Sequence, residues 1–177
     1  FRPYFGMGMW DMGEALPGLW YDVMVGPTLS SLGVKASQQD RKWTSGASVW
    51  WTPTTHEFGP RGAYGDWEYH DELATRFGIS TVNSPEQSYR SSEGGSPENT
   101  TLKLADGVNV FEIGSLAPGV TVEEVDYRIL SFDAGLKYKG IFFQVEYYQR
   151  WLDNCRADGA LPVTEIKDEG FYAQAAF

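Results

Sequence analysis

Hydrophobic and polar side chains alternate with a period of two along much of the chain, most regularly over residues 126–151. Within residues 130–138 the apolar side chains occupy the even positions, and within residues 141–147 they occupy the odd positions. Because successive side chains of a β-strand point to opposite faces, the pattern predicts two strands with one apolar face each.

The turn between these two predicted strands falls at Lys139-Gly140. A two-residue loop sets Leu136 opposite Phe143, and every apolar residue of one strand then meets an apolar residue of the other. A three-residue loop would set Leu136 beside Phe142 and exchange the faces of one strand. We therefore predict an antiparallel hairpin with a two-residue turn.

Similar alternation predicts further strands, and helical periodicity is scarce. The predicted strands are residues 19–26, 44–52, 68–82, 126–138, 141–151 and 170–177. The long connections at 27–43, 83–125 and 152–169 fall on one side of an up-and-down sheet, and those at 53–67 and 139–140 fall on the other. With no fixed-period repeat and no sign of a second domain, residues 1–177 form a single all-β, antiparallel, up-and-down domain in this prediction.

The apolar face of these strands needs either a protein core or lipid against it. In the hairpin, the apolar band covers about nine residues, the length with which a tilted strand crosses a bilayer. Tyr138 lies near one end and Tyr147, Tyr148 and Trp151 near the other, an arrangement that resembles the aromatic girdles at membrane interfaces. The candidate lipid-facing residues are Leu130, Phe132, Leu136, Phe143 and Val145.

The opposite face of the predicted strands is polar and carries charges of both signs. The two-residue turn puts Asp133 opposite Glu146, and like charges at such positions destabilise a sheet unless water or a cation lies between them. That is unusual for a sheet in a soluble protein. The candidates for lining a water-filled pore are Glu72, Arg76, Asp133, Lys137, Gln144, Glu146 and Arg150.

The formal net charge of −10 argues against nucleic acid or an anionic membrane surface as the main partner. No apolar run approaches the roughly 20 residues of a membrane helix, and the mean hydropathy of −0.36 is compatible with alternating barrel strands.

Cys155 is the single cysteine, so no intrachain disulfide forms, and we expect it to be inert. Because the chain starts at Phe1 without Met or a signal peptide, we expect a processed protein or a fragment.

Three segments carry a family resemblance: residues 33–78, with GASVWWTPTTHEFGPRGAYGDWEYHDELATRFG at their end; residues 132–154, FDAGLKYKGIFFQVEYYQRWLDN; and residues 169–177, EGFYAQAAF. Together they resemble Gram-negative outer-membrane porins related to the phosphate-selective (O/P type) group. The resemblance implies a transmembrane β-barrel of commonly about sixteen strands. About six of these would be present here, as an incomplete part of the larger barrel.

The resemblance also implies a bacterial outer-membrane location, lipid around the barrel, and a channel for passive diffusion of ions and small hydrophilic solutes. A homotrimer is compatible with this interpretation. Phosphate selectivity does not carry over, because it depends on clusters of Arg and Lys. Here the inward Arg and Lys candidates mix with Asp and Glu on an acidic chain, so we expect a general ion filter.

Other kinds of site are less well supported. His70 and Glu72 lack a clear third metal ligand, and Asp133 with Glu146 lacks the apolar pocket of a glycosidase acid. The GPRGAYG segment lacks the Lys-Ser/Thr ending of a phosphate loop and is interpreted as a turn. We therefore predict no enzyme activity, metal or cofactor.

The strongest alternative to a porin is a soluble, acidic β-sandwich that binds carbohydrate, since Trp and Tyr stack on sugars. A second sheet over the apolar face would favour this alternative.

Overall fold

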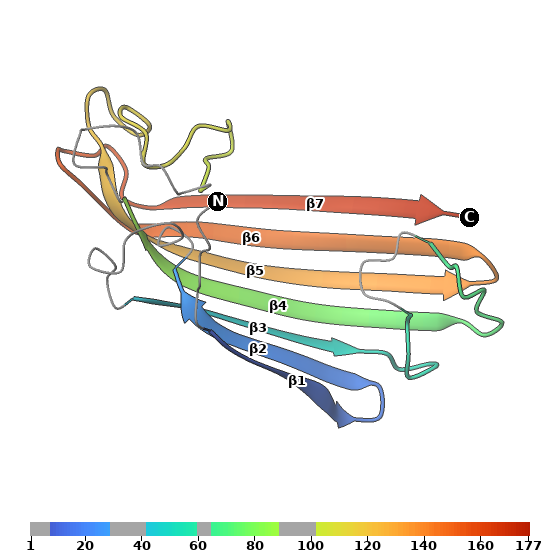
Figure 1. Cartoon of the computed structure of the whole chain (residues 1–177). Helices are drawn as coiled ribbons and strands as arrows, with labels where there is room; N and C mark the ends of the chain where they lie inside the picture. The colour runs from blue at the N-terminus through green and yellow to red at the C-terminus, as the bar shows by residue number, and fades with distance from the viewer. Residues whose placement is uncertain (1–7, 29–41, 60–64, 89–101) are drawn as a thin grey trace, which may run out of the picture.

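The computed structural model describes residues 8–28, 42–59, 65–88 and 102–177. They form one antiparallel sheet in which each strand pairs with the next along the chain (Figure 1). This confirms the all-β, up-and-down prediction. The strands are Met9–Leu16 (β1), Leu19–Pro27 (β2), Trp43–Trp51 (β3), Ala74–Gln87 (β4), Val122–Tyr138 (β5), Ile141–Ala157 (β6) and Ile166–Ala176 (β7).

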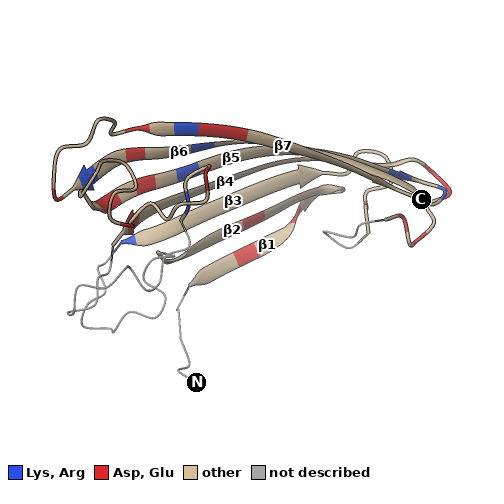
Figure 2. Cartoon of the chain, turned by 90° about the horizontal axis from the view of Figure 1, so that it is seen from above, with Lys and Arg blue, Asp and Glu red and all other residues tan. Residues whose placement is uncertain are grey.

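The seven-stranded sheet is curved and open, with β1 and β7 as its two edges (Figures 1 and 2). One end, which we call the turn end, carries the connections at 17–18, 52–73 and 139–140. The opposite end, the loop end, carries those at 28–42, 88–121 and 158–165. None of the described residues forms a helix that is long and apolar enough to cross a membrane.

The predicted hairpin is confirmed. Lys139 and Gly140 have φ angles of 47° and 84°, as the favoured two-residue hairpin turn requires. The alternating pattern and this turn together fix the register. The observed pairs are Tyr138 with Ile141, Leu136 with Phe143, Ala134 with Val145, Asp133 with Glu146 and Phe132 with Tyr147.

Strand β1 was not predicted, and the predicted bounds of β4, β5, β6 and β7 differ from the observed ones. Strand β1 was missed because both of its faces are mixed: Trp10 and Glu14 share one face, and Met9 and Asp11 share the other. Strand β4 begins at Ala74 and not at residue 68. Residues 66–73 turn instead, with Tyr69 at a φ of 53° that an extended strand does not contain. Most of the predicted turn at GPRGAYG lies outside the described residues.

One face of the sheet is apolar, and no second sheet covers it within the described residues. Phe143 is 41% exposed although its neighbour Phe142, on the other face, is 1% exposed. All five candidate lipid-facing residues share this face by register. Other large exposed side chains that share it are Val23, Val25, Val49, Trp51, Phe77, Ile79, Tyr138, Ile141, Tyr147 and Phe171.

The apolar face ends in polar contacts towards the loop end. Tyr147 Oη donates a hydrogen bond to Glu169 Oε2 at 2.7 Å and accepts one from Gln149 Nε2 at 2.8 Å. Beyond this level Arg128 pairs with Asp153, so this face of β5 and β6 becomes polar towards the loop end. Figure 2 shows several charged residues of β5 to β7 near the loop end of the sheet.

The first strand also limits the apolar face. Asp11 of β1 lies opposite Val23 of β2, and its Oδ2 accepts a hydrogen bond from Tyr21 Oη at 3.1 Å. The apolar surface is therefore continuous from β2 to β7 and is interrupted by a carboxylate at the β1 edge.

The opposite face is covered at both ends and open in the middle. At the loop end, Val110 and Phe111 from the β4–β5 connection pack into a small core with Val125 and Leu152. Figure 1 shows this connection rising over one end of the sheet. At the turn end, the Phe58 ring covers Phe142 at a centroid distance of 6.5 Å. The middle of this face lies between these two covered regions.

Candidate functional site

One row of cross-strand neighbours crosses the open middle of the polar face, and we call it the polar row. Each member lies directly opposite the next one on the adjacent strand. It therefore combines carboxylates and aromatic rings at a single level of the sheet. From β1 to β7 its members are Glu14, Trp20, Trp50, Gly78, Asp133, Glu146 and Tyr172.

The centre of the polar row is an ion pair made possible by a glycine. Arg76 Nη2 lies 3.3 Å from Asp133 Oδ1, and the two side chains are 10% and 11% exposed. A Cβ at Gly78 would collide with the Asp133 carboxylate, so only glycine leaves the space through which Asp133 reaches strand β4. The pair also offsets the repulsion between Asp133 and Glu146 that the register creates.

An aromatic pair lies beside this ion pair. The rings of Trp20 and Trp50 are nearly parallel, at 8°, with centroids 6.3 Å apart. Arg76 Cζ lies 5.8 Å from the centroid of the Trp50 ring, within cation–π range. Neither tryptophan was among the predicted site residues. The alternating pattern does place Trp50 at a polar position and Trp51 at an apolar one.

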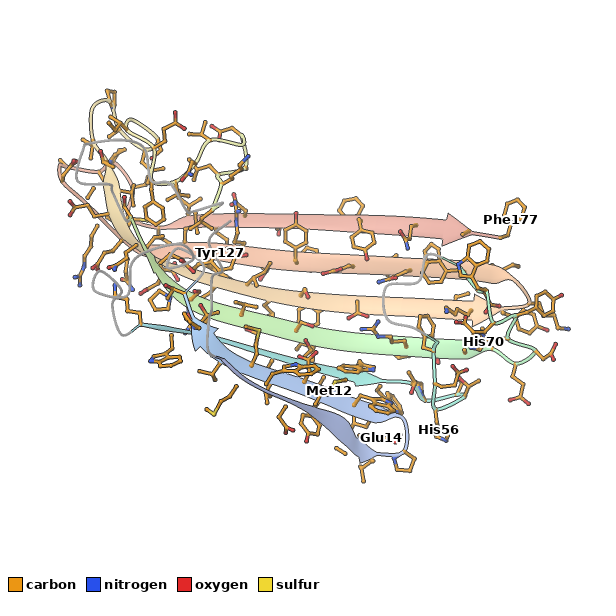
Figure 3. The ribbon with its side chains drawn as sticks, in the orientation of Figure 1. Met12, Glu14, His56, His70, Tyr127 and Phe177 are labelled. Carbon is orange, nitrogen blue, oxygen red and sulfur yellow. The ribbon has the colours of Figure 1, made fainter. Side chains whose placement is uncertain are left out.

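A pocket of about 310 Å³ opens over the aromatic pair. Five of its residues come from the β3–β4 connection: Thr52, His56, Glu57, Phe58 and Gly59. Figure 3 shows His56 of this connection at the same end of the sheet as Glu14. The full lining is Met12, Trp20, Trp50, Thr52, His56, Glu57, Phe58, Gly59 and Arg76.

Three further candidate pore-lining residues, Gln144, Glu146 and Arg150, share the polar face with Asp133. Gln144 Nε2 donates to Tyr172 Oη at 3.1 Å. Arg150 is held towards the loop end, where its Nε donates to Asp168 Oδ2 at 3.0 Å. With Arg76, Asp133 and Lys137, six of the seven candidates thus lie on one face; their role in a pore stays a prediction.

Glu72 and Lys137 have surroundings that the alternating pattern did not predict. Glu72 lies exposed in the turn before β4, so its expected position on a strand face was wrong. Lys137 lies on the polar face but is fully buried, with its Nζ 5.2 Å from the centroid of the Phe58 ring and 3.1 Å from Glu68 Oε2. It cannot line an open channel, because the β3–β4 connection covers it.

A cluster of charged groups fixes this connection to the turn end, and we call it the turn cluster: Glu57, Asp66, Glu68, His70 and Lys137. His70, which Figure 3 labels, contacts Asp66 through Nδ1, and its Nε2 lies 2.7 Å from Glu57 Oε1. The backbone N–H of Gly140 donates to Asp66 Oδ2 at 2.9 Å. The cluster therefore ties residues 66–70 to the β5–β6 turn.

The charges of the turn cluster support one another. Burial acts to lower the pKa of His70, but hydrogen bonds and attraction from Asp66 and Glu57 outweigh it and raise the pKa above its ordinary value. Burial acts to raise the pKa of Asp66, but its hydrogen bonds from His70 and from the Gly140 backbone lower it. The pKa of Glu68 is likewise lowered: burial acts against this, and its backbone hydrogen bond and Lys137 prevail.

Three members of the turn cluster also have the composition of a metal site. Donor atoms of Asp66, Glu68 and His70 lie within 4.8 Å of one another. However, Lys137 Nζ already contacts Glu68, and each ring nitrogen of His70 faces a carboxylate. The geometry therefore fits a network of ion pairs better than a metal centre, and His70 is joined by Asp66 rather than by Glu72.

No protein-family model, curated protein or solved structure matches this chain. The function is therefore argued from the surfaces of the sheet. These are an apolar face exposed over six strands, and a polar face whose open middle carries the polar row and its pocket.

Proposed function

We propose that this chain forms part of the wall of a transmembrane β-barrel in a bacterial outer membrane, around a water-filled channel for ions and small hydrophilic solutes. The observation that carries the proposal is the contrast between the two faces. Leu136 and Phe143 lie in the apolar band on one face of β5 and β6, whereas Asp133 and Glu146 lie on the opposite, charged face of the same two strands. Alternation of apolar and polar faces is the pattern of outer-membrane barrel strands.

The dimensions of the apolar face support a membrane. Soluble monomers rarely expose an apolar patch larger than about 300–600 Å². The apolar face extends over β2 to β7, which at about 4.8 Å between strands is roughly 24 Å across. Along β5 it runs from Leu130 to Tyr138, close to the roughly nine residues of a tilted membrane strand. Lipid satisfies such a surface without a second layer of protein.

The edges of the sheet add a requirement. An unpaired backbone N–H or C=O group in hydrocarbon is unfavourable by roughly several kcal/mol. Strands therefore span membranes only as closed barrels, in which every strand is paired. The proposal therefore requires that β1 and β7 pair with further β-structure in the membrane. A homotrimer of such barrels is compatible with the proposal.

The soluble β-sandwich alternative has one observation in its favour, the aromatic pair of Trp20 and Trp50. It needs a second sheet over the apolar face, and the described residues contain a single sheet. The porin proposal accounts for both faces, and the aromatic pair then lies inside the channel.

The proposal is tested with the natural protein purified in detergent and inserted in planar bilayers. We expect stable, stepwise conductance that rises in proportion to salt concentration, as for a wide aqueous pore. A protein that stays monodisperse in detergent-free buffer and gives no conductance steps would rule the proposal out and favour the soluble alternative.

A further inference from the structure

The aromatic pair lies on the polar face of the sheet and, with Met12 and Phe58, forms the apolar part of the pocket; we call the pair the platform. Trp20 and Trp50 are cross-strand partners whose rings lie within 8° of parallel. Neither ring faces the apolar side of the sheet: the adjacent Trp51 does, where it contacts Phe77 at a centroid distance of 6.5 Å. Two indole rings at the polar face therefore need an explanation other than the packing of the apolar band.

Polar groups stand around the platform and are held in place by the protein itself. Glu57 Oε2 accepts a hydrogen bond from the Gly59 backbone N–H at 2.8 Å, and its Oε1 faces His70. On the other side, the Arg76 guanidinium is fixed between Asp133 and the ring of Trp50. Groups that are already ordered lose little entropy when a ligand arrives.

The combination of groups selects a ligand class. A pyranose ring has a face of C–H groups, which the electron-rich face of an aromatic ring attracts, and a rim of hydroxyls. Hydroxyls both donate and accept, so they can bond to the carboxylate of Glu57 and to the guanidinium of Arg76 at once. A free anion would meet Glu57 and a free cation would meet Arg76, so neither is favoured as much as a neutral ring.

We propose that the pocket over Trp20 and Trp50 binds neutral saccharides, and that it gives the channel a preference for sugars among the solutes that pass. The volume of about 310 Å³ lies at the lower end of small-molecule pockets and suits one or two sugar rings. The preference for sugars in transport rests on the proposed pore; the binding itself does not.

Binding is tested with the full natural protein in detergent, titrated with maltose and with cellobiose while tryptophan fluorescence and heat are recorded. Polyethylene glycol of similar mass is the control for a solute with no ring face. We expect saturable binding of at least one disaccharide and none of the polymer. Trp50→Ala should weaken binding about tenfold or more, the size of a lost aromatic contact.

The matched control is Trp51→Ala, which removes the same side chain from the next residue of β3 but from the opposite face. It should leave saccharide affinity unchanged. Trp50→Phe keeps a ring at the platform and should recover part of the affinity. Unaltered circular dichroism and mobility in detergent check that each variant is folded.

The outcomes separate the pocket from the pore. Conductance without any saccharide binding would overturn the pocket and leave the pore proposal standing. Saccharide binding by a protein that gives no conductance would support the pocket and overturn the pore. Equal loss of affinity in Trp50→Ala and Trp51→Ala, or competitive displacement of maltose by inorganic phosphate, would show that the pocket is not a neutral saccharide site.

Discussion

The two faces of the sheet differ in what surrounds their side chains. On the polar face, protein covers both ends: Phe142 lies under Phe58 and is 1% exposed. On the apolar face, the adjacent Phe143 is 41% exposed. A step of one residue along β6 thus moves a phenyl ring from a protein interior to an open surface.

This difference assigns different partners to the two faces. Side chains of the polar face are held by contacts within the protein. These contacts are the ion pair of Arg76 with Asp133, the turn cluster and the loop-end core. The apolar face has no comparable protein partner among the described residues, so its stability depends on the medium against it. Substitutions at adjacent residues should therefore have unequal effects, and the following predictions use such pairs.

The largest effect is expected for a charge on the apolar face. Phe143→Arg should reduce insertion into bilayers, because a basic residue at the midplane of a barrel's lipid face is unfavourable by about 2–4 kcal/mol. Gln144→Arg, one residue further, should insert normally because residue 144 lies on the opposite, polar face of the sheet. The yield of folded protein in lipid vesicles measures both, and equal yields for the two variants would show that the apolar face does not meet lipid.

A second effect is expected at the glycine of the polar row. Gly78→Val should destabilise the protein by about 1–3 kcal/mol, because the new side chain collides with the Asp133 carboxylate. Urea unfolding in lipid vesicles measures the change. In the background of Asp133→Gly the same substitution should be nearly neutral, since the collision is removed. An equal loss in both backgrounds would mean that Gly78 is required for another reason.

A third effect concerns pH at the turn cluster. The raised pKa of His70 means that its contribution to stability is complete below the ordinary value of 6.5 and is lost as pH rises through the raised value. The lowered pKa values of Asp66 and Glu68 give a contribution that is present above their ordinary values and lost as pH falls. The β3–β4 connection should therefore be most resistant to proteolysis at pH values above the ordinary pKa values of Asp66 and Glu68 and below the raised pKa of His70.

Proteolysis of the connection over a series of pH values, with rates corrected for protease activity, measures this resistance. The native connection should become more susceptible at alkaline pH. His70→Gln should be susceptible at neutral pH and lose the alkaline change, and His56→Gln should keep it. An alkaline change that persists in His70→Gln would assign it to another group.

The smallest effect is expected for ion preference. Asp133→Asn together with Glu146→Gln should shift the reversal potential of the channel towards anions, because carboxylates at the water-facing surface attract cations. The shift should be modest and should shrink in high salt, since screening acts over about 8–10 Å at physiological ionic strength. An unchanged reversal potential would show that these carboxylates do not line the conduction path.

The part of the fold that sequence predicts best is the part that local pattern determines. The register of β5 and β6 follows from strict alternation and a turn of two residues with positive φ. The start of β4 does not follow from local pattern, because residues 66–73 are held by contacts with Lys137 and Gly140, which are distant in sequence.

The site shows the same division. Alternation placed Arg76, Asp133 and Glu146 on one face, but the burial of Lys137 depends on Phe58, which a strand pattern does not reveal. The pairing of Trp20 with Trp50 depends on the register of β2 and β3 across a long connection. Long-range contacts of this kind carry no periodic signal in the sequence.

The central claim, that the apolar face meets lipid and the polar face meets water, is tested most directly by electron paramagnetic resonance. In a Cys155→Ala background, spin labels are attached at Phe143→Cys and, separately, at Gln144→Cys, in protein reconstituted in vesicles. The account predicts that the label at 143 collides more with oxygen, which concentrates in hydrocarbon, and that the label at 144 collides more with an aqueous nickel complex. Equal accessibility of both labels to the nickel complex would contradict it.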